Sequence, residues 1–335
     1  MGNVIAYSGI STKIRAMQRE LLREEDYKKL AQQGISRDKA LFLSSFKPYA
    51  ELFSAEGAEQ MHRADVERRL ILSVLRDFEK LYRFANTQQR VFMDLYFSHF
   101  EVRMIKACLQ AVAGHAEMPQ LALYSPYFAK HSKIDLKALS ESGTISQFID
   151  RLSGTPYHAI LSRLYESGTA GLVDYETAID MRYFNTVWKR KDKLLKPDAR
   201  TVLERTLGSR IDILNLNWIY RVKKYYKMTP NELYSLLIPV RYRISLAEMK
   251  AMAEAPDLPT FAEAERKTRY GPLLAAGRKE GENLGDAADR LLERLYRASA
   301  RNDPYSIAPI NTYFYLKEKE IRRIVSIIER SHYEA

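Results

Sequence analysis

The sequence predicts an all-α protein, and three observations support that class. From Val66 to Tyr82, apolar residues recur at the three- and four-residue steps that place them on one face of a helix. Alternation of apolar and polar residues is scarce, and no Asn-Gly or Asp-Gly pair separates two apolar runs, so hairpins have no signal. Glycine and proline divide the chain into segments of ordinary to long helix length.

These glycine and proline breaks give the order of the elements. A short helix is expected before each pair of long ones, and the breaks fall between the periodic segments. The short helices are expected around Leu21–Leu30, Leu136–Leu152 and Leu246–Glu265. The breaks include Gly34, Pro48, Pro119, Gly143, Gly154 to Pro156, Pro197, Pro230, Pro239, Pro256, Gly271 with Pro272, and Pro304 with Pro309.

A pattern within the long helices occurs three times. It consists of an acid, an apolar residue directly after it, and apolar residues three and seven positions beyond that residue. Its copies begin at Glu101, Asp212 and Glu320. An acidic amphipathic segment precedes each copy by 34 to 36 residues, beginning near Glu67, Glu176 and Asp286. The matched spacing of two successive elements favours an internal repeat over chance similarity between helices.

Three repeats, 1–118, 119–240 and 241–335, account for the chain. Each repeat would comprise one short helix and two long helices, with the long pair packed antiparallel through its apolar faces. Three such units whose ends meet form a pseudo-threefold body around an axis. That geometry suits a collar or socket better than an enzyme cleft.

The net charge is concentrated in one stretch. The 335 residues carry 53 lysines and arginines against 42 acids, a formal charge of +11. Residues Arg182 to Lys227 hold thirteen bases and four acids, which contribute +9 of that total. A local positive field of this kind attracts an acidic protein face, phospholipid headgroups or nucleic acid.

Aromatic residues are interleaved with these bases. Aromatic side chains beside bases can stack on nucleotides. At helical spacing they are more often core, however, and we expect a buried aromatic face with the bases on a solvated one. The aromatic residues are Tyr183, Phe184, Trp188, Trp218, Tyr220, Tyr225 and Tyr226.

Residue patterns required for catalysis or cofactor binding are missing from the sequence. The six histidines include no i, i+4 pair and no His-Glu-x-x-His, and there is no Cys-x-x-Cys. The glycine-rich loops that bind nucleotide phosphates are also missing. The single cysteine, Cys108, lies in the apolar stretch Met104–Val112, where we expect a buried, inert thiol. We therefore expect no catalytic residue, metal or cofactor.

The sequence predicts neither secretion nor a membrane crossing. One cysteine cannot form a disulfide framework, which fits a reducing, cytoplasmic setting. Residues Met1 to Gly9 lack the basic and apolar regions of a secretory signal. No apolar stretch approaches the roughly 18 to 20 residues that a membrane-spanning helix needs.

The two ends and the middle of the chain resemble one family. Tyr7, followed by Lys13-Ile14-Arg15-Ala16-Met17, resembles the opening of the central-stalk adaptor of rotary ATPases. This adaptor is the C subunit of archaeal and bacterial A/V-type enzymes and the d subunit of the eukaryotic vacuolar enzyme. The segment Tyr313 to Arg322, which reads YFYLKEKEIR, is similar to the terminal signature of that family, and Asp212 to Lys223 is similar to its internal helix.

The resemblance implies a non-catalytic funnel built from three similar three-helix units. It further implies a protein that caps the cytoplasmic face of the membrane rotor (proteolipid) ring and receives the tip of the central shaft, formed by D- and F-type subunits. Its function would be to couple shaft and ring in ATP-linked proton or sodium transport. Membrane contact would be peripheral only, and nucleic acid would not be a partner.

Seven residues on the repeated helices are candidates for binding those partners. Their bases would contact the shaft, and charge reversal at Arg221 and Lys223 would weaken shaft binding at low salt. The bases from Arg182 to Lys227 would contribute to binding the shaft or to docking near the ring and its lipid headgroups. An alternative is that these acids and bases form ion pairs within the chain. The candidates are Arg103, Arg221, Lys223, Arg322, Glu101, Asp212 and Glu320.

Two alternative functions stay open at this point. A basic helical-repeat protein that binds RNA would show an affinity that falls steeply with salt and would not co-purify with ATPase subunits. An enzyme of unrecognised type would need a concave site with perturbed carboxylates, which a sequence does not reveal.

Overall fold

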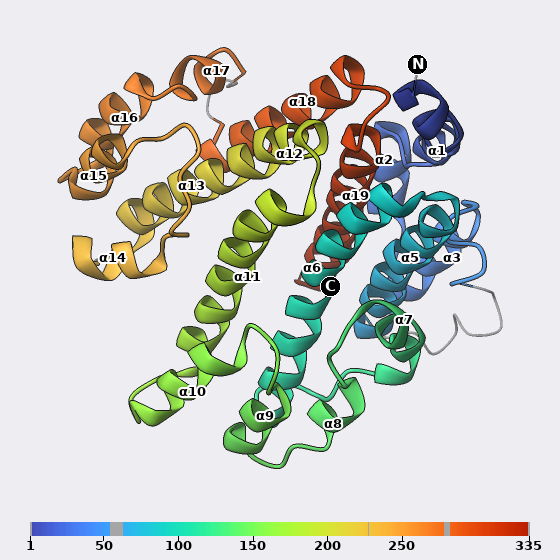
Figure 1. The fold of residues 1–335 in the computed structure, drawn as a ribbon, viewed down its shortest axis with the longest axis horizontal. Helices are drawn as coiled ribbons and strands as arrows, with labels where there is room; N and C mark the ends of the chain where they lie inside the picture. Colours follow the sequence, from blue (N-terminus) through green and yellow to red (C-terminus); the bar gives the residue numbers. More distant parts are fainter. Residues whose placement is uncertain (1, 54–62, 227, 278–281, 334–335) are drawn as a thin grey trace. The chain divides into compact units, whose positions relative to one another are not determined.

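The computed structural model describes residues 2–53, 63–226, 228–277 and 282–333, and every secondary-structure element within those ranges is a helix. This confirms the predicted all-α class (Figure 1). Of the helices in these ranges, none combines the length and apolar character needed to cross a bilayer.

The chain divides into two compact units. The first comprises Met1–Arg90 and Ser299–Ala335, and the second comprises Val91–Ala298. The divisions fall inside two long helices, α6 (Thr87–Val112) and α18 (Leu284–Asn302). The other helices of the first unit are α1 (Gly2–Arg19), α2 (Glu24–Gln32), α3 (Ser36–Ser44), α5 (Arg63–Phe84) and α19 (Ala308–Tyr333).

The second unit contains the basic stretch and most of the short helices. Its elements between α6 and α18 are η1 (Leu121–Leu123), α7 (Ser125–His131), α8 (Leu136–Ser140), α9 (Ile145–Arg151), α10 (His158–Glu166), α11 (Leu172–Leu194), α12 (Pro197–Leu203), η2 (Glu204–Gly208), α13 (Ser209–Tyr225), α14 (Pro230–Leu236), α15 (Leu246–Glu254), α16 (Leu258–Lys267) and α17 (Gly271–Ala275).

The segments that carry the predicted repeat pattern all lie in helices. The preceding segments near Glu67, Glu176 and Asp286 lie in α5, α11 and α18, and the three copies of the pattern lie in α6, α13 and α19. The expected short segments hold α2, then α8 with α9, then α15 with α16. Further short helices, α3, α7, α10, α14 and α17, have no counterpart in the sequence pattern.

The first unit is organised around α19, which packs against α1, α2 and α5. The apolar face predicted from Val66 to Tyr82 is the buried face of α5, and Phe78 lies 5.9 Å from Phe314 of α19, centroid to centroid. Residues 307–318 are all buried, which is why α19 needs internal partners for its polar side chains.

In the second unit, polar contacts join α6 to α11 at one end. Lys106 Nζ lies 2.8 Å from Asp180 Oδ2, and Gln110 Nε2 donates to Glu176 Oε1 at 2.5 Å. These four residues lie in the C-terminal half of α6 and the N-terminal half of α11. The two long helices are therefore fixed to each other there by polar side chains.

A π-helical turn, η2, connects α12 to α13. Gly208 at its end is buried, and a Cβ added there would lie 2.5 Å from Cγ of Tyr242. Glycine thus permits the loop before α15 to lie directly against the backbone of this turn. Helices α14, α15 and α16 contact α13, as Figure 1 shows at the left of the view.

Candidate functional site

Glu320 lies in a buried polar cluster on α19. Its carboxylate accepts hydrogen bonds from the backbone N–H of Leu22 at 2.6 Å, from the Tyr49 hydroxyl, and from Lys317 Nζ at 2.9 Å. Lys317 also donates to the Tyr49 hydroxyl at 2.7 Å. The side chains of Lys317 and Glu320 are 0% and 2% exposed, so each charge is balanced by the other away from water. Burial raises the pKa of the Tyr49 hydroxyl, which stays protonated.

Asp212 of α13 occupies a second buried site. Its carboxylate accepts from the backbone N–H groups of Tyr242 at 3.1 Å, Arg243 at 2.6 Å and Ile244 at 3.2 Å. The hydroxyl of Tyr270 donates to it at 3.0 Å. Burial raises the pKa of Asp212, and these four hydrogen bonds act in the opposite direction. One carboxylate thus holds the loop before α15.

Glu101 of α6 makes the corresponding contact in a half-buried setting. Its Oε1 accepts from the Ser132 hydroxyl at 2.5 Å, and the Ser132 oxygen in turn accepts from the N–H of Ile134 at 3.0 Å. Burial raises the pKa of Glu101, while the Ser132 hydrogen bond and the positive charge of Arg190 lower it. The carboxylate therefore fixes the turn between α7 and α8.

The three acids share one structural role. Glu101 holds the turn before α8, Asp212 holds the loop before α15, and Glu320 holds the residue before the N-cap of α2. In each case the bound segment leads directly into short helices. In terms of the predicted repeats, each acid anchors the start of the short-helix segment in the repeat that follows, and the third acid anchors that of the first. No sequence signal predicted this pairing.

The four bases differ from the acids in their environment. Arg103, Arg221 and Arg322 are exposed. Lys223 is half-buried, and its ammonium donates to the carbonyl oxygen of Ala255. Burial lowers the pKa of Lys223.

Glu320 and Arg322 each lie near an oppositely charged residue other than the one two positions away on the same helix. Glu320 pairs with Lys317, and Arg322 Nη1 lies 3.9 Å from Oε2 of Glu318. Acid and base two residues apart on a helix do not face each other, which explains why the structure separates Glu320 from Arg322.

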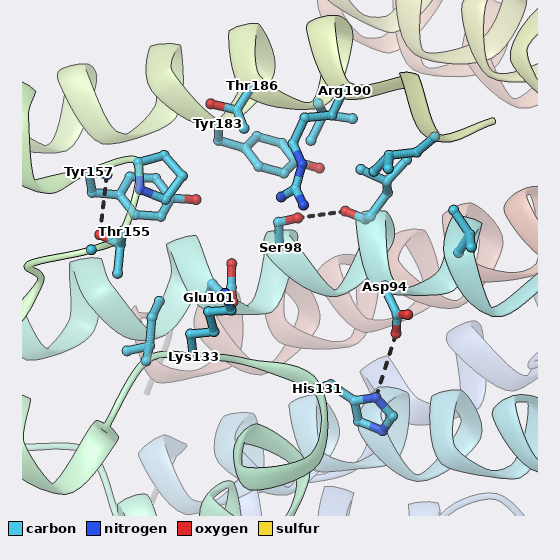
Figure 2. A pocket seen from close by; sticks show the side chains of 17 residues that line it. Asp94, Ser98, Glu101, His131, Lys133, Thr155, Tyr157, Tyr183, Thr186 and Arg190 are labelled. Atoms are coloured by element: carbon cyan, nitrogen blue, oxygen red, sulfur yellow. Dashed lines mark hydrogen bonds and ion pairs between the residues drawn. The ribbon is translucent and has the colours of Figure 1, made fainter. Parts of the chain in front are cut away.

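A cavity of about 490 Å³ lies between α6 and α11 in the second unit. Its wall on α6 includes Asp94, Ser98 and Glu101, and its wall on α11 includes Tyr183 and Arg190. Figure 2 shows the Arg190 side chain directed from α11 toward α6, with Ser98 and Glu101 opposite. The predicted residue Glu101 and a base of the basic stretch thus meet at one cavity.

Further side chains of the cavity give it both donors and acceptors. Tyr157 and Lys133 line it, and His131 Nδ1 lies 3.7 Å from Asp94 Oδ1 (Figure 2). Among the residues that the structure describes, no three His, Cys, Asp or Glu side chains are arranged to hold a metal ion. Cys108 is buried, and burial raises the pKa of its thiol to about 12. This agrees with the buried thiol of low reactivity that the sequence predicts.

The interpretation of the interleaved aromatic residues as core is only partly right. Trp218, Tyr225 and Tyr226 are 41%, 63% and 51% exposed. Trp218 and Tyr225 lie on α13 and Tyr226 directly follows it, whereas Ile219 and Val222 of the same helix are buried. The remaining aromatic residues of the stretch, Tyr183, Phe184, Trp188 and Tyr220, are buried or half-buried.

The bases of the stretch are mostly on the surface, with one clear exception. Lys191 is buried, and its Nζ lies 2.8 Å from carboxylate oxygens of both Asp192 and Glu204. Its ammonium also lies 4.3 Å from the Trp188 ring centroid. Lys227, the last base of the stretch, lies outside the described residues.

The fold and these contacts define an all-α protein of long helices, in which buried and half-buried carboxylates hold the adjoining loops. Comparison with known proteins identifies the family. The model of the ATP synthase (C/AC39) subunit family matches residues 10–334, and the chain therefore belongs to that family. The family consists of structural components of ATP synthase that are not catalytic.

Individual relatives align over nearly the full chain. The C subunit of the A-type ATP synthase of Thermococcus kodakarensis is 25% identical over 334 residues, which cover 96% of this chain and 86% of the relative. The C subunit of the A-type ATP synthase of Methanosphaera stadtmanae is 24% identical over 336 residues, covering 97% and 83%.

Proposed function

We propose that this protein is the central-stalk adaptor of a rotary A/V-type ATPase and couples the rotating shaft to the membrane rotor ring. The main support is the family match over residues 10–334. Relatives that are C subunits of A-type ATP synthases also align along nearly the whole chain. Its partners would be the D- and F-type shaft subunits and the proteolipid ring. It would lie peripherally on the cytoplasmic side of the membrane and serve ATP-linked proton or sodium transport.

The proposed arrangement is a funnel of three repeats, 1–118, 119–240 and 241–335. The equivalent contacts of Glu101, Asp212 and Glu320 support it, since each acid anchors the start of the following short-helix segment. A coupling protein must be stiff to transmit torque. Buried, hydrogen-bonded carboxylates that fix loops to long helices contribute to that stiffness.

Among the seven candidate residues, we assign direct shaft contact to Arg103 and Arg322. Both are exposed on helices that carry an anchoring acid two residues earlier. Glu101, Asp212 and Glu320 would support these helices by holding loops, and the bond from Lys223 to the Ala255 carbonyl fits the same supporting role. The remaining candidate, Arg221, belongs to a separate surface described below.

Affinity capture tests the function directly. The tagged full-length protein should retain shaft and ring subunits from detergent-solubilised membranes of its native host. Purified protein should also bind an isolated D-type shaft protein. Recovery of the tagged protein without any ATPase component would contradict the proposal.

Charge reversal tests the proposed shaft contacts. The variant R103E/R322E should bind the isolated shaft protein at least about tenfold more weakly at low salt, because reversed rim charges repel the partner. The matched control K28E/K29E makes the same change in net charge on exposed residues of α2. Equal weakening in both variants would remove Arg103 and Arg322 from the interface.

A further inference from the structure

The end of α13 and the residues after it carry an unusual exposed surface. Trp218, Tyr225 and Tyr226 are exposed there, and Met228 is 41% exposed. Trp218, Arg221 and Tyr225 follow one another at steps of three and four residues, so they share one side of the helix. We call the set Trp218, Arg221, Lys224, Tyr225, Tyr226 and Met228 the α13 patch.

Cations and rings within the patch lie against each other. The guanidinium of Arg221 lies 5.5 Å from the Trp218 ring centroid, and Lys224 Nζ lies 5.1 Å from that of Tyr225. Acids nearby in the sequence do not balance this charge, because no Asp or Glu occurs between residues 213 and 231. The next acid, Glu232, is bound to the N–H and hydroxyl of Thr229 in the capping box of α14.

Lys223 differs from the bases of the patch because its charge is used within the protein. It lies on the same turn but is half-buried, with its ammonium bound to the Ala255 carbonyl. Arg221 and Lys224 are instead exposed. The positive charge of the patch is thus directed to the outside of the protein.

We propose that the α13 patch binds the headgroup region of an anionic membrane surface. Tryptophan and tyrosine are enriched at membrane interfaces, where one end of the ring lies among apolar chains and the other in water. Lysine and arginine beside them are attracted to anionic headgroups. Protein–protein interfaces are also rich in aromatic residues, methionine and arginine. The run of residues 213–231 holds no acid to compensate Arg221 and Lys224, and this excess of positive charge beside exposed rings favours an anionic lipid surface.

This inference does not depend on the proposed function. It concerns contact of the isolated protein with lipid, whereas the coupling function concerns binding to shaft and ring subunits. It also removes Arg221 from the shaft interface, so that the variant R221Q is expected to bind an isolated shaft protein with unchanged affinity.

Vesicle flotation of the purified full-length protein tests the inference. The protein should float with phosphatidylcholine vesicles that contain phosphatidylglycerol and should remain in solution with vesicles of phosphatidylcholine alone. The variant R221Q/K224Q should lower the partition coefficient roughly 20- to 30-fold, since each base near an anionic surface contributes about a fivefold factor. The control K28Q/K29Q removes two exposed bases of α2 and should float like wild type.

A second pair of variants separates the aromatic contribution from charge. The variant Y225S/Y226S should lose most of its flotation at unchanged net charge. Its control, Y165S/Y305S, replaces two tyrosines that are 48% and 41% exposed elsewhere in the chain and should keep it.

Three outcomes would overturn the inference. Equal loss in R221Q/K224Q and K28Q/K29Q would show an effect of net charge alone. If wild-type protein fails to float while R221Q/K224Q loses ring or shaft subunits during co-purification, the patch is a protein interface. Salt-sensitive binding of single-stranded RNA that requires Trp218 and Tyr225, without flotation, would assign the patch to nucleic acid.

Discussion

The carboxylate of Glu320 accepts a hydrogen bond from the backbone N–H of Leu22 at 2.6 Å, across 298 positions of sequence. The same carboxylate balances the buried ammonium of Lys317. One side chain therefore joins the last long helix to the start of α2 and compensates a charge that has no access to water.

Removal of that carboxylate should strongly destabilise the protein. The variant E320A leaves Lys317 charged and buried and deprives Leu22 N–H and Tyr49 of their acceptor, at a cost of about 3 to 5 kcal/mol. Urea denaturation followed by circular dichroism measures the effect. The exposed residue Glu25 provides the control E25A, for which the midpoint should barely move.

The double variant K317M/E320L distinguishes the two contributions. It removes both charges, and it should be more stable than E320A because no uncompensated charge remains. A double variant that is less stable than E320A would show that the hydrogen bonds to Leu22 and Tyr49 matter more than the charge.

Stability should depend on pH through Glu101. Burial raises the pKa of this carboxyl in the folded protein, so the folded state binds a proton more readily than the unfolded state does. As the pH falls from neutral through the raised pKa toward 4.5, wild type should therefore gain stability relative to E101Q. At pH values above that raised pKa, Glu101 is ionised in both the folded and the unfolded state, so wild type should show no such gain in stability.

Denaturant unfolding of wild type and E101Q between neutral pH and about pH 4 measures this difference. Glu141, whose side chain is 58% exposed, provides the control E141Q. A wild-type-minus-E101Q difference that is constant across this range, or that runs in the opposite direction, would contradict the prediction.

Gly208 should not tolerate a side chain. In G208A the new Cβ would lie 2.5 to 2.9 Å from three atoms of Tyr242, and we expect a loss of about 1 to 3 kcal/mol. The control G9A adds a Cβ that meets nothing within 4 Å in helix α1, so it should be neutral or slightly stabilising. The second-site change Y242A removes the ring and should recover part of the loss. Thermal unfolding of G208A, G9A, Y242A and G208A/Y242A measures these differences in stability.

Cys108 should not react in the folded protein. Its thiol is buried, and burial raises its pKa to about 12, so little thiolate is accessible at mildly alkaline pH. Ellman's reagent should label it only at the rate of unfolding and should label it at once in denaturant. Rapid labelling of native protein would show that the core around α6 opens readily.

Much of the fold could be predicted from local pattern. The face from Val66 to Tyr82 follows from the period of about 3.6 residues, and the recurrence of acid and apolar residues located all three of Glu101, Asp212 and Glu320 on long helices. Such patterns report which side of a helix is apolar. They do not report what a particular acid touches.

The hydrogen bonds of the three acids could not be predicted from the sequence, and the reason is physical. Asp212 binds backbone N–H groups of the loop at 242–244, and every residue except proline offers the same donor, so no residue type marks the partner. The exposure of Trp218 and Tyr225 could not be predicted either, because helical spacing alone does not show which face meets the core.

The use of backbone donors also bears on how far the sequence can diverge. A carboxylate that recognises main-chain N–H groups places a requirement on the acid but hardly any on the residues that it holds. As far as this contact is concerned, positions 242 to 244 can change to any residue but proline while Asp212 continues to hold the loop. This chain and the two relatives named above share only about a quarter of their residues, and a contact of this kind tolerates such divergence at the positions that it holds.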